Sequence, residues 1–173
     1  MKKLFIAVLA LAVSASCMKT GKESASWSRT VAGTITTELS STHEQVYTAD
    51  NVVATVDCPD MFKEQFDFEF EKVRFVAAMP ELAITLPNLT YKQEKSEEYD
   101  TFDWVIDMKD VVPTIGGVPY EQYRMSTVKG RLSNGSLRIE FWLTFRGTEH
   151  HVVYVWENKK PDESGAEDTN TEK

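Results

Sequence analysis

The sequence predicts an all-β domain in which eight antiparallel strands run up and down around a barrel. Three observations favour this fold class. Apolar and polar residues alternate with a period of two through most of the chain, helical windows are few, and turn residues separate the alternating runs at regular intervals. Strands spaced in this way form either a barrel or a β-sandwich. We favour the barrel because closure leaves no exposed strand edge, and the sandwich is the alternative.

The first third of the domain contains three predicted strands. Residues 30–39 alternate, and one face carries Val31, Gly33, Ile35, Thr37 and Leu39. A β-branched run follows at 51–56, and residues 66–71 alternate aromatic with acidic side chains, as expected of a half-buried strand. The alternation changes phase at Lys72, which predicts a β-bulge. Between the second and third runs, residues 59–63 suit one helical turn.

The middle third is less regular. Residues 82–86 and 89–91 flank Pro87 and Asn88, which predicts two strands or one broken strand. Residues 102–108 alternate again, and a second single helical turn is expected at 120–122. One further strand is expected at 123–132.

The last third contains the strongest hairpin signal in the chain. Asn134-Gly135 lies between alternating runs, and this dipeptide favours a type I′ turn because both residues tolerate positive φ. Residues 137–145 form the most regular strand, and a last strand covers 150–156. A first strand near Trp27 could then pair with a last strand near Trp156 and close the barrel.

The N-terminus has the pattern of a bacterial export signal. Lys2 and Lys3 precede ten apolar residues, 4–13, and small residues lead into Cys17. We therefore expect a signal peptide at 1–16, a lipid attached to Cys17 and a linker at 17–26. The apolar run is too short to span a membrane, which takes about 20 residues. The expected location is the cell envelope, as an outer-membrane lipoprotein on its periplasmic or surface side.

The alternative is cleavage without lipidation. Lipoprotein signals usually carry a larger aliphatic residue three positions before the cysteine, where this chain has Ser14. Cleavage by ordinary signal peptidase would leave a soluble secreted or periplasmic protein. In either case the barrel domain is expected at 27–158, followed by a disordered acidic tail at 159–173, which contains almost no apolar residues.

Charge and cysteine content limit the function classes. The formal net charge is −8, and an acidic exported protein is a poor partner for nucleic acid, whose phosphates require clustered Lys and Arg. Only two cysteines are present. With a lipid on Cys17, Cys58 would have no intramolecular partner, and we expect it to be an unreactive thiol. Secretion without lipidation would instead allow a Cys17–Cys58 disulfide.

The chain resembles the calycin-like (lipocalin-like) β-barrel lipoproteins of Bacteroidetes. Strand 30–39 with its central Gly33, residues 84–91, the 114–120 turn and the 133–137 hairpin carry this resemblance in their order. It implies an eight-stranded up-and-down barrel, and the family offers no settled activity or catalytic residue. True lipocalins have a glycine two places before the first-strand tryptophan, whereas Ala25 precedes Trp27 here. This departure argues against a standard carrier of small hydrophobic molecules.

Aromatic side chains supply the candidate ligand site. The residues expected to line the barrel interior and contact a ligand are Phe68, Phe70, Trp104, Phe141, Tyr154 and Trp156. An eight-stranded barrel has room for its own side chains or one small ligand. These rings therefore either form a packed core or surround a ligand.

Two other features carry side chains that could form a site. Trp142 lies on the polar face of its strand, which makes it a candidate contact for a protein or glycan partner. His150 and His151 are adjacent on a strand, so their rings point to opposite faces and do not converge on a metal ion. No catalytic motif is recognisable, and we expect neither an enzyme nor a cofactor.

Two functions follow from these observations. The first is an envelope-anchored barrel that binds a small apolar or amphipathic ligand. The second is a filled barrel that contacts a protein or glycan through Trp142 or the loop at 94–100.

Overall fold

The computed structural model describes residues 25–96 and 101–158, which fold into one antiparallel β-sheet. Within these ranges there are eleven strands, two 3-10 helices and no α-helix. The strands are β1 (Trp27–Leu39), β2 (Gln45–Cys58), β3 (Gln65–Val73), β4 (Leu82–Thr90), β5 (Lys92–Lys95), β6 (Phe102–Val111), β7 (Thr114–Ile115), β8 (Val118–Pro119), β9 (Met125–Leu132), β10 (Ser136–Phe145) and β11 (Thr148–Glu157). The helices η1 (Met61–Lys63) and η2 (Glu121–Tyr123) overlap the two predicted helical turns. The all-β prediction is confirmed.

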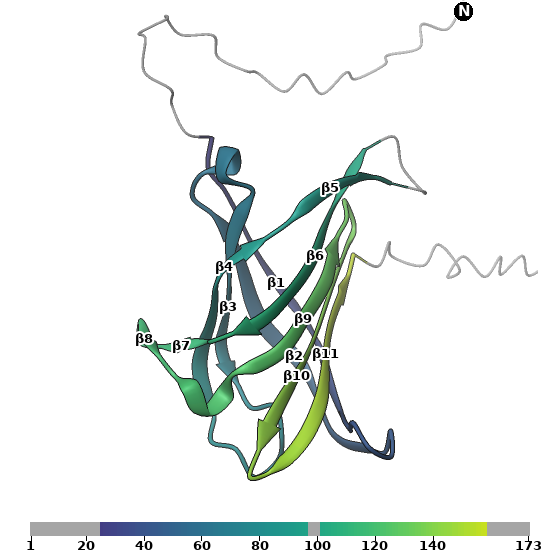
Figure 1. Ribbon diagram of the computed structural model, residues 1–173. Helices are drawn as coiled ribbons and strands as arrows, with labels where there is room; N and C mark the ends of the chain where they lie inside the picture. The colour runs from purple at the N-terminus through teal and green to yellow at the C-terminus, as the bar shows by residue number, and fades with distance from the viewer. Residues whose placement is uncertain (1–24, 97–100, 159–173) are drawn as a thin grey trace, which may run out of the picture.

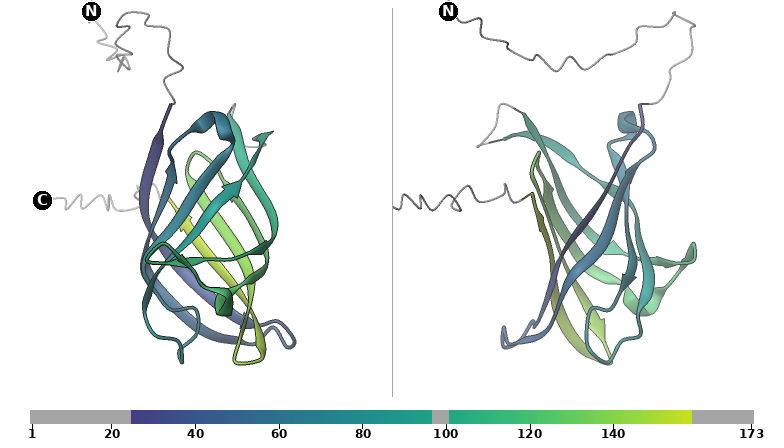
Figure 2. Two further views of the ribbon diagram at one scale, coloured as in Figure 1. Left: turned by 60° about the vertical axis from the view of Figure 1, so that its left-hand side comes forward. Right: turned by 180° about the vertical axis from the view of Figure 1, so that it is seen from behind.

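The strand order is β5-β6-β9-β10-β11-β1-β2-β3-β4-β7-β8. The sheet curls around a common interior, as Figures 1 and 2 show from three directions. The first and last long strands pair, from Thr34↔Val155 to Leu39↔His150, as the sequence predicts. All strands belong to one sheet, whereas a β-sandwich needs two. The structure has eleven strands where eight are predicted, and complete closure of the barrel stays a prediction.

Two predicted irregularities are located by the strand register. The register between β3 and β4 shifts between Phe70 and Val73, which confirms the bulge expected at Lys72. Residues 82–90 form one strand, β4, with a local distortion at Asn88, whose φ is 54°. The Asn88 N–H donates to Asp67 Oδ1 at 2.7 Å, so a side chain accepts the hydrogen bond at this distortion.

The turn type predicted at Asn134-Gly135 is wrong, although the hairpin itself is present between β9 and β10. Neither residue of this turn has a positive φ. Left-handed turns occur instead at Arg146-Gly147 (φ 52° and 79°) and at Gly116-Gly117 (φ 58° and 79°). The Ser133 N–H donates to the Ser136 carbonyl at 2.9 Å, and this bond closes the β9–β10 turn without the left-handed conformation.

The hydrophobic core lies inside the curl. Alternate residues of β1 and β10 are buried, which confirms their predicted apolar faces. The largest fully buried side chains, with less than 2 % of their surface exposed, are Tyr154, Phe66, Phe68, Phe70, Phe75, Phe141, Ile35, Ile84, Leu86, Leu89, Ile106 and Met125. Aromatic rings therefore supply much of the packing.

Several predictions fall on residues outside the described ranges. These are the signal peptide at 1–16, the lipid on Cys17, most of the linker at 17–26, part of the 94–100 loop and the tail at 159–173. Within the described ranges, the search for a helix of sufficient length and hydrophobicity to span a membrane found none.

Candidate functional site

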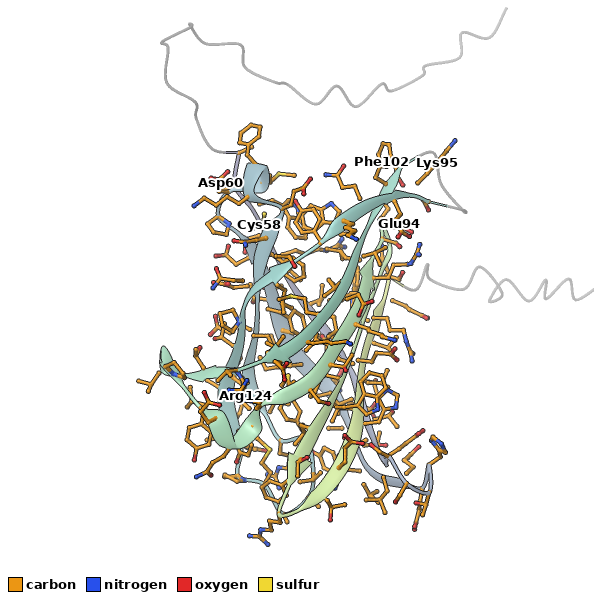
Figure 3. All side chains as sticks on the ribbon, in the orientation of Figure 1. Cys58, Asp60, Glu94, Lys95, Phe102 and Arg124 are labelled. Carbon is orange, nitrogen blue, oxygen red and sulfur yellow. The ribbon has the colours of Figure 1, made fainter. Side chains whose placement is uncertain are left out.

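The sheet opens at the end where β1 begins. The β1–β11 pairing stops at Thr34↔Val155, so the preceding part of β1, from Trp27 to Gly33, pairs only with β2. At this end β5 and β6 turn away from the corner between β2 and β3, as Figure 3 shows by the separation of Asp60 from Phe102. An open cavity of about 320 Å³ results, and we call it the mouth. It is lined by Trp27, Arg29, Thr101, Phe102, Trp104, Leu132, Ser133 and Asn134.

Trp104 is the central aromatic ring of the mouth. Trp27 meets it edge to face, with ring centroids 5.4 Å apart. Tyr91 stacks on it at 4.2 Å with the two ring planes nearly parallel, 9° apart. Phe66 lies at 6.1 Å from both Trp104 and Tyr91. These contacts position the indole of Trp104, which remains partly exposed to the cavity.

Arg29 brings a positive charge to the mouth. It shares the inward face of β1 with Trp27 and Val31, because residues two apart on a strand point the same way. Its guanidinium lies 4.3 Å from the centre of the Trp156 ring, within the range of a cation–π interaction. Within the described parts of the chain Arg29 makes no ion pair. Its charge can therefore attract an anionic group of a ligand.

Below the mouth, Cys58 and Tyr91 are buried. The Cys58 thiol donates to the Gln65 carbonyl, with sulfur and oxygen 3.2 Å apart, and burial raises the pKa of this thiol. Burial also raises the pKa of Tyr91, whose hydroxyl donates to the Met61 carbonyl at 3.4 Å. A buried thiol with a raised pKa stays protonated, which is unfavourable for nucleophilic attack.

Further inside, five aromatic rings fill the interior. Neighbouring rings in this group have centroid distances of 4.8 to 5.7 Å, and all five side chains are fully buried. We call this group the plug; it consists of Phe68, Phe70, Phe75, Phe141 and Tyr154. The Tyr154 hydroxyl donates to the Val52 carbonyl at 3.1 Å. Its polar atom is thus satisfied within an otherwise apolar cluster.

Gly33 allows the plug to form. A Cβ atom at this position would lie 2.3 Å from the Val155 carbonyl oxygen and 2.9 Å from the Tyr154 hydroxyl. Any larger residue would push β11 away from β1 or displace the Tyr154 ring. The central glycine of the first strand therefore has a packing role at the β1–β11 junction.

The six predicted ligand-contacting residues divide between the plug and the mouth. Phe68, Phe70 and Tyr154 belong to the plug and contact one another. Phe141 also belongs to the plug and contacts Phe75. Trp104 lines the mouth. Trp156 is not among the residues that line the mouth, but its ring contacts the guanidinium of Arg29, which is one of them. Sequence reasoning did not select Trp27, Arg29, Tyr91 or Phe102. Continuing the Val31 alternation toward the N-terminus would have identified Trp27 and Arg29.

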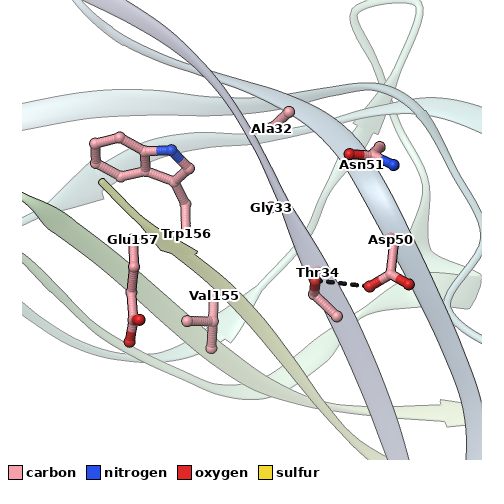
Figure 4. Close-up of a pocket in the computed structure, with 8 residues that line it drawn as sticks. All are labelled: Ala32, Gly33, Thr34, Asp50, Asn51, Val155, Trp156 and Glu157. Carbon is pink, nitrogen blue, oxygen red and sulfur yellow. Dashed lines mark hydrogen bonds between the residues drawn. The ribbon is translucent and has the colours of Figure 1, made fainter. Parts of the chain in front are cut away.

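A second hollow lies beside β1 where this strand separates from β11 (Figure 4). It measures about 670 Å³ and is lined by Ala32, Gly33, Thr34, Asp50, Asn51, Val155, Trp156 and Glu157. Thr34 donates to Asp50 at 2.9 Å, and the β1–β2 register shifts between Gly33 and Ile35. This hollow is larger than the mouth, but only Trp156 contributes an aromatic ring. The mouth combines three aromatic rings with a cation and is the stronger candidate.

Trp142 lies on the outer wall, on the face of β10 opposite the buried residues. Its indole stacks on the His151 ring, with centroids 4.3 Å apart and planes 13° apart. His151 Nε2 is 3.5 Å from Glu140 Oε2. His150 points the other way and is buried, with its Nδ1 2.9 Å from the Thr148 carbonyl oxygen. The two histidine rings thus lie on opposite faces, as strand alternation predicts.

Within the ranges 25–96 and 101–158, no group of three or more His, Cys, Asp or Glu residues is arranged to hold a metal ion. Comparisons with protein-family models, curated protein sequences and solved structures found no match to this chain.

Proposed function

We propose that this chain is an exported cell-envelope protein, anchored by a lipid on Cys17, that binds a small apolar or amphipathic ligand in the mouth. The observation that supports it best is the convergence of Trp27, Phe102 and Trp104 with Arg29 around an open cavity of about 320 Å³. Small-molecule sites typically have volumes of about 300–1,000 Å³ and mainly apolar walls with a few polar groups. The mouth fits that description at its lower size limit.

We further propose that the curled sheet is an eight-stranded barrel of the calycin-like type. β4 and β5 follow one another in the chain, as do β6 and β7. β5 pairs with β6 from Lys92↔Val105 to Lys95↔Phe102, and β4 pairs with β7 at Thr85↔Thr114. Counting β4–β5 and β6–β7 as two long strands, with β8 as an appended hairpin arm, gives eight strands around the interior. This assignment supports the resemblance to calycin-like lipoproteins, which stays a proposal.

The plug restricts where a ligand can bind. Its rings are fully buried and pack on one another, so the proposed ligand occupies the mouth above them. The partly exposed indoles suit an apolar ring or chain, and Arg29 suits a carboxylate, sulfonate or phosphate on the same molecule. Cys58 is disfavoured as a nucleophile, because burial raises the pKa of its thiol.

Binding of a fluorescent dye tests the proposed site. 1-Anilinonaphthalene-8-sulfonate combines aromatic rings with one anionic group, so the purified protein should bind it with enhanced emission. Phe102→Ala should weaken dye binding at least threefold and Trp104→Ala at least tenfold.

Phe102 is 64 % exposed, so its replacement should leave the unfolding midpoint unchanged. Val118→Ala is the matched control, because Val118 is 65 % exposed and lies outside the mouth. Dye binding that both mouth variants leave unchanged would refute the site.

The role of Arg29 is tested by a pair of dyes. Arg29→Gln removes the charge and retains much of the side-chain length. It should weaken binding of the sulfonated dye and leave binding of the uncharged dye Nile red nearly unchanged. Equal loss for both dyes would mean that Arg29 supports the packing of Trp156 rather than binding an anionic group.

A second candidate function is a filled barrel that contacts a protein or glycan partner through its outer wall. It is supported by the tight packing of the plug and by the position of Trp142 stacked on His151 outside the core. In that case Trp142→Ala would reduce capture of the partner, and Phe102→Ala would not.

A further inference from the structure

Two aromatic side chains project from the molecule at the mouth end. Phe62 in η1 is 74 % exposed and Phe102 at the start of β6 is 64 % exposed, more than any other aromatic side chain in the described ranges. η1 lies between β2 and β3, at the corner marked by Asp60 in Figure 3, and Phe102 lies across the opening. We call Phe62 and Phe102 the aromatic rim. Large exposed rings of this kind commonly mark a contact with a protein or a membrane.

The rim is attached to the body of the protein on both sides of the mouth. The Met61 N–H donates to the Ala25 carbonyl at 3.0 Å, which joins η1 to the residues just before β1. The Tyr91 hydroxyl donates to the Met61 carbonyl, and the Tyr91 ring stacks on the ring of Trp104. Trp104 follows Phe102 by two residues on β6, so Tyr91 connects η1 with the strand that carries Phe102. The two projecting rings therefore sit on supported elements at one end of the molecule.

Nearby charges argue against a polyanionic partner. Lys63 lies 3.9 Å from Asp60, and Arg131 pairs with Asp103 at 2.8 Å and with Glu94 at 3.2 Å. Lys63 and Arg131 are thus matched by carboxylates. Arg29 in the mouth and Lys95, which pairs with Phe102 between β5 and β6, are further cations at this end, fewer than the cluster of about four to eight basic residues that binds anionic lipid by charge. The exposed rings suit the interfacial region of a bilayer, where aromatic side chains are enriched.

The N-terminal segment is attached at the same end of the molecule as the aromatic rim. The described chain begins at Ala25, beside η1, so residues 1–24 are joined to the molecule at the rim. If Cys17 carries the proposed lipid, only residues 18–24 separate it from Ala25. Eight residue-to-residue steps of at most about 3.6 Å limit that separation to about 29 Å. An anchored molecule must therefore keep its rim end close to the bilayer.

We infer that the protein docks on a lipid bilayer with its mouth facing the membrane and with Phe62 and Phe102 inserted at the interface. The inference rests on the proposed lipid on Cys17 and identifies the bilayer as the source of the amphipathic ligand. The lipid tethers the chain through Cys17 but does not by itself orient the folded domain. Insertion of the aromatic rim supplies the contact that orients it.

Depth-dependent quenching tests this orientation in the complete lipidated protein. The protein is reconstituted in phosphatidylcholine vesicles that contain lipids brominated on the acyl chain. The additional emission of Phe62→Trp, relative to the parent protein, should be quenched by brominated lipid at least threefold more than that of Val118→Trp. Val118 is comparably exposed but lies in the β7–β8 hairpin (Figure 1). Equal quenching at the two positions, or stronger quenching at 118, would overturn the inference.

A second variant separates this inference from the proposed ligand site. Phe62 does not line the mouth, so Phe62→Ser should leave binding of the sulfonated dye unchanged. In a mature chain that starts at residue 17 with Cys17→Ser, and so carries neither signal peptide nor lipid, Phe62→Ser should reduce binding to phosphatidylcholine vesicles at least threefold. Dye binding without Phe62-dependent vesicle binding would retain the ligand site and refute the membrane contact. Phe62-dependent vesicle binding without dye binding would retain the membrane contact and refute the ligand site.

Two further outcomes would count against the inference. Mass analysis could find a mature N-terminus without lipid, and the protein would then have no anchor. In that case the inference requires the unlipidated protein to float with phosphatidylcholine vesicles in a Phe62-dependent manner, and a protein that does not float would refute the membrane contact. A Phe62-dependent dimer in size-exclusion chromatography would make the rim a contact between two copies of the chain instead.

Discussion

The plug and the mouth are both built from aromatic residues on inward strand faces, yet they have opposite exposure. In the plug, Phe70 touches Phe68, Phe75 and Tyr154, and all four side chains are fully buried. In the mouth, Trp27 and Trp104 touch one another but remain partly exposed. The difference arises from strand pairing: β1 is paired on both sides beside the plug, but only with β2 beside the mouth. Aromatic content therefore does not distinguish a core from a binding site.

The largest expected effect concerns the plug. Phe70→Ala removes a ring that contacts three others, and a cavity of this kind typically costs about 3–5 kcal/mol of unfolding free energy. Denaturant unfolding measures the loss, and binding of the sulfonated dye below the transition should be retained. Loss of dye binding in a folded Phe70→Ala protein would show that the plug and the mouth act as one site.

The junction between the two regions should respond to Gly33→Ala. The new methyl would meet the Val155 carbonyl and the Tyr154 ring, and overpacking of this kind costs about 1–3 kcal/mol. Gly135→Ala is the matched control, because no atom lies within 4 Å of the added Cβ and this residue has no positive φ. Similar unfolding midpoints for the two variants would contradict the close approach of β11 to β1.

Alkaline pH should destabilise the plug in particular. Burial raises the pKa of Tyr154 to about 12, above the ordinary value of 10 that applies in the unfolded chain. The folded state therefore holds the phenolic proton more tightly. The associated stabilisation is complete below pH 10 and is lost as the pH rises from about 10 to about 12.

Urea unfolding at several pH values measures this loss, with Tyr154→Phe as the control. Burial also raises the pKa values of Tyr91 and Tyr123, so both proteins should lose stability in alkali. The wild type should lose more than Tyr154→Phe. Parallel curves would mean that Tyr154 is not the buried titrating group.

The smallest effect is expected at the outer wall. Trp142→Ala removes a ring that stacks on His151 outside the core, and such a pair contributes about 1 kcal/mol or less. Thermal unfolding should shift by only a few degrees, and dye binding in the mouth should not change. A loss comparable to that of Phe70→Ala would place Trp142 among the core residues and would remove it as a partner contact.

The extent of successful prediction differs between the fold and the candidate site. Alternation identified the long strands and the bulge at Lys72, because both depend on local periodicity. The pairing of the first with the last strand was expected from closure of a barrel, not from alternation. It did not reveal the left-handed turn at Arg146-Gly147, where a non-glycine residue has positive φ. Phe102 was placed on an apolar face by alternation, but it lies at the start of β6, where no element of the described ranges covers its side chain.

The sequence by itself determined the all-β class and placed most of the strand aromatic residues on inward faces, because a period of two assigns every side chain of a strand to one face. Only the tertiary structure decided which of those rings form the plug and which line the mouth. That division depends on where β1 separates from β11 and where β5 and β6 diverge from the β2–β3 corner. These are distances between segments far apart in the chain, and local alternation contains no information about them.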